Sequence, residues 1–220
     1  MCGLQQTGLS GYSILTCKTT ASKALIRLIS LTGSVRALVQ SGVKSKAAAM
    51  IRAGLFRYAK WAAKDGGFGR HAVIPTFLLE VIDTSLSGTD ITRHIKARMA
   101  ELAAEHRDFL RRGDDDDDDV VSGAASDDPL LQQYRRRPPV IYGLFIVHTV
   151  VLVLTVDSAK AAPDEAQVSY HVEVNFNSPY QGVWNALTVA IPVCMARDDL
   201  RSRLADFPVL GHAEESDPDA

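Results

Sequence analysis

Apolar residues recur every three to four positions in three stretches of the first half of the chain, which is the period of an amphipathic helix. The stretches are 21–40, 43–64 and 89–112. They are followed by Ser41-Gly42, Asp65-Gly66-Gly67 and Gly113, and glycine commonly stops a helix. Between the last two lies 72–82, a short run rich in Val, Ile, Thr and Phe that predicts a strand. We therefore predict a helical part with one strand over this half, preceded by a flexible segment over residues 1–20.

The second half of the chain has the pattern of a sheet followed by a helix. Three strands are predicted there, over residues 140–147, 150–157 and 167–176. In the third strand apolar and polar side chains alternate, as expected when one sheet face is buried. Ser178-Pro179 then begins a helix that extends to about Asp206, with a kink or interruption at Pro192. The whole pattern predicts an α+β fold with helices packed on a small, mostly antiparallel sheet.

Charged, polar segments interrupt and follow these elements. Asp114 to Asp119 are six consecutive aspartates, and Arg135 to Arg137 are three consecutive arginines. Like charges at such density repel each other and do not pack. We therefore predict a disordered acidic and basic linker over 113–139 and an acidic tail over 207–220. The parts on either side of the linker, 21–112 and 140–206, are expected to share one domain.

One apolar segment allows two interpretations. Val140–Val156 contains no charged residue and follows three arginines, which is the outline of a membrane span with a cytosolic basic flank. As a helix, however, it would rise only about 25 Å, against a hydrocarbon core of roughly 30 Å. Ten of its 17 residues are Val, Ile or Thr, which favour strands. We expect a β-hairpin that turns near His148-Thr149, and we keep a membrane span as the alternative.

Composition and charge narrow the class of protein. Apolar residues make up 46% and charged residues 23% of the chain, so wholesale disorder is excluded. The net charge of −2 hides an uneven distribution, because residues 1–64 hold ten Lys or Arg and no Asp or Glu. Three dispersed cysteines form no disulfide or metal pattern, which predicts an intracellular protein, most simply a cytoplasmic one. The basic, hydroxyl-rich start also fits a mitochondrial import segment, so mitochondrion and membrane are kept as alternative locations.

A basic stripe is the clearest binding candidate. On the helix predicted over 43–64, four cations lie close together on the helical wheel: Lys46, Arg57, Lys60 and Lys64. Tyr58 and Trp61 are nearby and could stack on a ligand. The stripe suits phosphate groups or an acidic protein, so we expect a protein partner and keep nucleic acid as an alternative.

A second candidate is acidic and lies on two predicted strands. Asp157 ends one strand, and Glu173, Val174 and Asn175 lie on the next. An Asp followed by Glu-x-Lys on the next strand is the layout of the PD-(D/E)xK nuclease-like group, which this segment resembles. The resemblance implies two carboxylates that share Mg²⁺ and a third residue beside the attacking water. The chain departs from the pattern in having Asn175 in place of the lysine and Val156 in place of the proline.

The six histidines fit no metal-binding signature, and no motif in the chain implies a cofactor. The function that we predict is therefore a non-catalytic interaction or scaffold module with an unidentified protein partner. Two alternatives stay open: a degenerate nuclease-like domain that uses Mg²⁺, and a single-span membrane protein.

Overall fold

The structure is a computed structural model, and it describes residues 10–111, 133–160 and 167–210. The helices are α1 (Ser10–Gln40), α2 (Ala47–Gly66), α3 (Gly88–Leu110) and α5 (Gly182–Ser202). Short 3₁₀ turns are η1 (Lys44–Lys46), η2 (Phe68–Arg70) and η4 (Leu204–Asp206). The strands are β1 (Phe77–Val81), β2 (Val140–Val147), β3 (Val150–Asp157) and β4 (Ser169–Asn175).

The four strands form one mixed sheet in the order β1-β2-β3-β4. β1 and β2 are parallel, with α3 as their crossover, while β2–β3 and β3–β4 are antiparallel. In the β2–β3 hairpin Val147 lies opposite Val150, and His148 takes a positive φ of 55° in the turn. The predicted α+β class is confirmed, and two of the three strand pairings are antiparallel, as expected.

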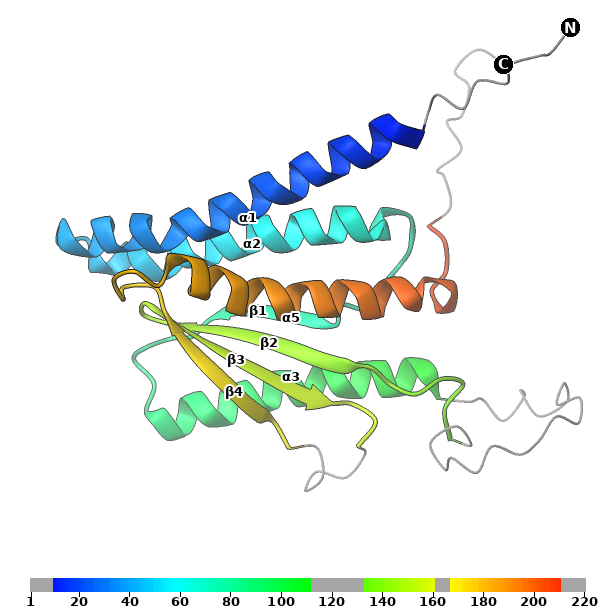
Figure 1. The fold of residues 1–220 in the computed structure, drawn as a ribbon. Helices are drawn as coiled ribbons and strands as arrows, with labels where there is room; N and C mark the ends of the chain where they lie inside the picture. Colours follow the sequence, from blue (N-terminus) through cyan, green and yellow to red (C-terminus); the bar gives the residue numbers. More distant parts are fainter. Residues whose placement is uncertain (1–9, 112–132, 161–166, 211–220) are drawn as a thin grey trace, which may run out of the picture.

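The helices cover the sheet in unequal numbers (Figure 1). α3 packs on one face, and α2 and α5 pack on the other. α1 lies over α2 and α5 as an outer layer, so the acid-free first part of the chain forms the outermost helix and its neighbour. The candidate functional site lies between α1 and α2.

Each face of the sheet has its own hydrophobic core. On the α2/α5 side the fully buried side chains include Val35, Ile51, Val151, Phe176 and Val189. On the α3 side they include Met99, Ile141, Phe145 and Val156, with Ile95 and Leu102 nearly as buried. Burial of this apolar surface is the main source of folding free energy.

The apolar segment 140–156 forms the predicted hairpin, with its turn at the predicted position. Within the described ranges no helix has both the length and the apolar character needed to cross a membrane. Two central, mutually paired strands account for the lack of charge, because both of their faces are covered by helices.

Several predicted boundaries are corrected. α1 begins at Ser10, so the segment predicted as flexible is helical from that residue onward. The strand predicted over 72–82 is confined to Phe77–Val81; Pro75 has no amide hydrogen to donate to a neighbouring strand and lies just before it. The last helix begins at Gly182 rather than Ser178, and it continues through Pro192 without interruption.

The end of the predicted linker is packed rather than disordered. Tyr134 is only 1% exposed, and the Arg135 amide donates to the Leu110 carbonyl at 2.9 Å. Arg136 bonds to the Ser202 carbonyl and to the Asp206 carboxylate. The aspartate run and residues 211–220 of the acidic tail lie outside the described residues.

The predicted alternation in β4 is only partly reflected in burial. Val174 and Phe176 are buried as predicted, whereas Tyr170 and Val172 are exposed. The pairing of β4 with β3 shifts register between Val153 and Leu154 of β3, and β4 is one of the two outer strands of the sheet. The extra residue on β4 lies between Val172 and Tyr170, and it turns the side chains beyond it, Tyr170 first, away from the face that Val174 shares. Val172 lies before this bulge and is exposed on a strand with a neighbour on one side only.

His106 makes the stability of the fold sensitive to acid. Its ring is 1% exposed, and Nε2 donates to the Pro75 carbonyl at 3.0 Å. Burial lowers the pKa of His106, although the Pro75 bond and the nearby Glu105 and Asp199 carboxylates act in the opposite direction. The unfolded chain therefore binds a proton at this site at a higher pH than the folded chain does, so stability falls as the pH drops below the ordinary histidine pKa.

We expect the free energy of unfolding to fall by up to about 1.4 kcal/mol per pH unit below about pH 6.5 through this one residue. The measurement is urea unfolding at about pH 7.5, 6.5 and 5.5, comparing the wild type with His106→Gln, which keeps an amide donor but does not titrate. The variant should have the shallower pH dependence. Equal slopes in the two proteins would show that His106 does not control acid sensitivity.

Candidate functional site

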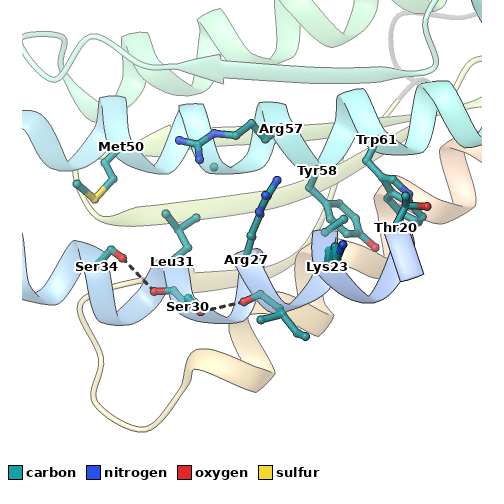
Figure 2. A pocket seen from close by; sticks show the side chains of 13 residues that line it. Thr20, Lys23, Arg27, Ser30, Leu31, Ser34, Met50, Arg57, Tyr58 and Trp61 are labelled. Carbon is teal, nitrogen blue, oxygen red and sulfur yellow. Dashed lines mark hydrogen bonds between the residues drawn. The ribbon is translucent and has the colours of Figure 1, made fainter. Parts of the chain in front are cut away.

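A groove with a volume of about 530 Å³ lies between α1 and α2 (Figure 2). Side chains from both helices line it, among them Lys23, Arg27, Ser30 and Ser34 from α1. Met50, Arg57, Tyr58 and Trp61 line it from α2. These residues all lie within residues 1–64, which contain no Asp or Glu.

Three cations face this groove. Lys23, Arg27 and Arg57 are exposed, and none of them forms an ion pair with an acidic side chain of the described residues. Arg27 and Arg57 extend from the two facing helices into the same space (Figure 2). No Asp or Glu is among the lining residues that the structure describes. Positive charge is therefore concentrated in the groove, where a bound anion would neutralise it.

Close contact between the two helices forms the floor of the groove. A Cβ atom on Gly54 would lie 2.6 Å from Leu31 Cδ2, so the absence of a side chain at Gly54 leaves the space that the Leu31 side chain occupies. Leu31 itself is buried, and Ala24 packs against the same core. The floor is apolar and rigidly packed, and the charged side chains stand above it.

The Trp61 end of the groove is braced by α5. The Arg197 guanidinium lies 5.7 Å from the Trp61 ring centroid, in cation–π geometry. The same guanidinium bonds to Asp65 at 2.9 Å and to Asp198 at 2.9 Å. Asp65 and Asp198 thus share one cation, which neutralises part of the negative charge at this end of the groove.

Tyr58 is a neutral member of the lining. Its hydroxyl lies 3.5 Å from Cys194 Sγ on α5. Burial raises the pKa of the Tyr58 phenol far above neutral pH, and the contact with Cys194 acts in the same direction. Tyr58 therefore stays protonated and adds no negative charge to the groove.

The serine hydroxyls of the groove are already used as donors. Ser30 Oγ donates to the Ile26 carbonyl at 3.0 Å, and Ser34 Oγ donates to the Ser30 carbonyl at 3.2 Å (Figure 2). Such bonds back to the helix leave the oxygen lone pairs, not the protons, facing outward. Recognition of an anion would therefore depend on Lys23, Arg27 and Arg57.

The structure separates the members of the predicted basic stripe. Arg57 lines the α1–α2 groove, whereas Lys60 borders a second, largely apolar hollow of about 430 Å³ between α2, α5 and β1. Lys46 ends the turn η1, and Lys64 lies in the last turn of α2; both are exposed and line neither hollow. The stripe follows the outer surface of α2, but only one of its residues faces α1.

Lys23 and Arg27 are cations of the α1–α2 groove that do not belong to the predicted basic stripe. They recur with Ser30 and Ser34 at spacings of four, three and four residues, which places all four on one face of a helix. This spacing is visible in the sequence. What cannot be read from it is that this face lies against Arg57 of the next helix.

The three residues of the nuclease-like candidate are not brought together. Glu173 lies opposite Leu152, whereas Asp157 is five residues further along β3, a distance of about 17 Å along the strand. The Asp157 carboxylate accepts the Ala159 amide and pairs with Arg137. Asn175 Oδ1 accepts bonds from Thr149 Oγ1 and from the Asn177 amide. Asp157 and Asn175 thus stabilise turns at opposite ends of the sheet.

Over the described ranges, no group of three or more His, Cys, Asp or Glu side chains is arranged to hold a metal ion. Comparison of the chain with known proteins found no matching family model, curated protein or solved structure. The chemistry of the α1–α2 groove is therefore the main basis for a functional hypothesis.

Proposed function

We propose that this protein is a non-catalytic interaction module that binds an acidic segment of a partner protein in the α1–α2 groove. The observation that carries the proposal is the set of three cations, Lys23, Arg27 and Arg57, which face one groove without an acidic partner among the described residues. Keeping like charges close together costs free energy, which a bound anion would recover. The proposal involves no cofactor and no reaction.

Two features favour an acidic peptide over a nucleic acid. From Lys23 to Ser34 the groove runs about 17 Å along α1, which is the length of roughly five extended residues. The aromatic side chains are poorly placed to stack on bases, because Tyr58 is 5% exposed and Arg197 lies over the Trp61 ring. Glu and Asp side chains need only the cations, which Arg can bind in a bidentate manner.

The test is binding of fluorescein-labelled polyglutamate of about twenty residues, measured by anisotropy at about 50 mM and 200 mM salt. We expect Arg27→Gln and Arg57→Gln each to weaken binding about tenfold at the lower salt concentration, since each removes one charge-assisted contact. Binding of the wild type should weaken as salt rises.

Arg52→Gln is the matched control, because Arg52 is an exposed arginine of the same helix that does not line the groove. It changes the net charge by the same amount, and it should leave the affinity within about twofold. Equal losses for Arg52→Gln and Arg57→Gln would contradict a groove-specific site. Tighter binding of a single-stranded oligonucleotide than of polyglutamate would contradict an acidic protein partner.

As part of this proposal we assign the protein to the cytoplasm. Cys2, Cys17 and Cys194 are too widely spaced to suggest a disulfide framework, which suits a reducing compartment. Cell fractionation tests the assignment, and recovery of the chain with mitochondria would contradict it.

A further inference from the structure

One face of α5 is apolar and exposed from Val183 to Met195. The exposed fractions of its side chains are 51% for Val183, 66% for Trp184, 36% for Leu187, 58% for Ile191 and 51% for Met195. Their spacing of three and four residues places them in one row along the helix, which we call the α5 stripe. The opposite face, with Val189, Val193 and Ala196, is buried against the rest of the fold.

The composition of α5 is that of a helix covered on all sides. From Gly182 to Ala196 it contains no charged residue on any face. Helices at a protein surface normally carry charged residues on the outer face, and helices that are apolar all round are buried. α1, α2 and the sheet cover only one side of α5. This composition therefore indicates that a further protein surface covers the α5 stripe.

The exposed apolar area is close to what a stable dimer needs. Trp184 alone offers roughly 150 Å², and the five residues together offer on the order of 500 Å². A standard interface buries about 800 Å² per partner, of which roughly 65% is apolar in homodimers, or about 520 Å². Gln181 and Asp198 are exposed at the two ends of the stripe and supply a polar rim.

We propose that the α5 stripe is a homodimer interface, in which it packs against the same stripe of a second copy of this chain. A stripe without charges meets its own copy without like-charge repulsion, which a two-fold axis would otherwise create. Obligate homodimers also have the most apolar interfaces, whereas transient partners of other kinds meet more polar surfaces. The α5 stripe has the homodimer character.

An antiparallel pairing of the two helices makes the stripe complementary to itself. With the two-fold axis at the level of Val189, Leu187 lies beside the partner's Ile191, and Val183 lies beside the partner's Met195. The same axis brings the 96% exposed Tyr180 to the level of the partner's Asp198, where its hydroxyl can donate to the carboxylate. Each end of the stripe is thereby closed by a polar contact.

The test is the mass of the full chain in solution by light scattering and by sedimentation equilibrium. We expect the wild type at about 10 µM to have twice the chain mass of 23.9 kDa. Ile191→Glu should raise the dissociation constant of the dimer at least about 100-fold, because it places a carboxylate in each half of the buried interface. Trp184→Glu, toward the other end of the stripe, should have the same effect.

Ile26→Glu is the matched control, because Ile26 on α1 is 60% exposed and Ile191 is 58% exposed. It makes the same chemical change off the stripe, and it should leave the dimer intact. Circular dichroism and thermal melting of each variant show whether it is folded. A monomeric wild type overturns the proposal, and so does a dimer that Ile26→Glu weakens as much as Ile191→Glu. The masses of the wild type, Ile191→Glu and Trp184→Glu are independent of polyglutamate binding, which reports on the α1–α2 groove. Ile26 lines that groove, so Ile26→Glu serves as a control for the mass measurement only.

Discussion

Replacing Phe145 by alanine should lower the free energy of unfolding by about 3–5 kcal/mol. Phe145 is fully buried in β2, the central strand that pairs with both β1 and β3. Its ring packs in the core under α3 together with Met99, Ile95 and Leu154. Removing the ring leaves a cavity that neighbours on a paired strand cannot easily fill, so the cost includes lost contacts as well as lost burial.

Gly143 provides an internal check on this prediction. A Cβ atom on Gly143 would lie 2.7 Å from Phe145 Cε2 and 2.7 Å from Met99 Sδ, so the ring occupies the space that a side chain would need. Gly143→Ala alone should therefore destabilise the protein by about 1–3 kcal/mol. In the Phe145→Ala background the penalty should nearly vanish, because the ring is gone and the methionine can shift.

Urea unfolding of the two single variants and the double variant, at one protein concentration, measures this coupling. Phe56→Ala is the control, because Phe56 is 54% exposed on α2 and its truncation should change stability by no more than about 0.5 kcal/mol. Additive effects of Phe145→Ala and Gly143→Ala would contradict the described packing of the ring over Gly143.

The hairpin was predictable because its cause is local. Residues 140–147 and 150–157 are dense in Val, Ile and Leu, and a strand buried on both faces needs no other signal. Tyr134 was not predictable for the opposite reason. It is one aromatic residue among Gln and Arg, and its burial depends on Arg135 reaching the end of α3.

Only some of the residues of the candidate groove could be predicted from the sequence. The wheel of the second helix correctly indicates that Arg57, Lys60 and Lys64 point outward, because this follows from helical geometry alone. Which of them faces α1 depends on how the two helices pack, including the contact of Leu31 with Gly54. A packing contact between residues 23 positions apart leaves no period in the sequence, so Lys23 and Arg27 could not be assigned to the same site as Arg57.

The position of α1, and therefore the shape of the groove, depends on a buried amide. Asn185 on α5 is 6% exposed, and its Nδ2 donates to Thr32 Oγ1 at 3.1 Å and to the Asn175 carbonyl at 3.0 Å. One side chain thus joins α5, α1 and the end of β4. Asn185→Leu should lower the free energy of unfolding by about 1–3 kcal/mol, because it removes the amide that donates to the buried Thr32 hydroxyl, whereas the Asn175 carbonyl still accepts the Ser178 amide at 3.2 Å.

A double-mutant cycle separates this bond from simple loss of packing. Thr32→Val removes the hydroxyl of a residue that is 3% exposed, and alone it should cost about 1 kcal/mol or more. In the Asn185→Leu background it should cost almost nothing, because an apolar pair of similar shape leaves no unpaired group between α1 and α5. Asn177→Leu, a change to an exposed asparagine, is the control and should lie within about 0.5 kcal/mol of the wild type.

The same variant links stability to the proposed function. Asn185 is not among the lining residues of the α1–α2 groove, yet Asn185→Leu should weaken polyglutamate binding about three- to tenfold, because α1 loses its polar contact with α5 and the cations on α1 and α2 lose their alignment. Restoring a compatible pair with Thr32→Val should recover part of that affinity. If Asn185→Leu is destabilised as expected but binds polyglutamate like the wild type, the alignment of the two helices does not determine anion binding, and the cations act as independent surface charges.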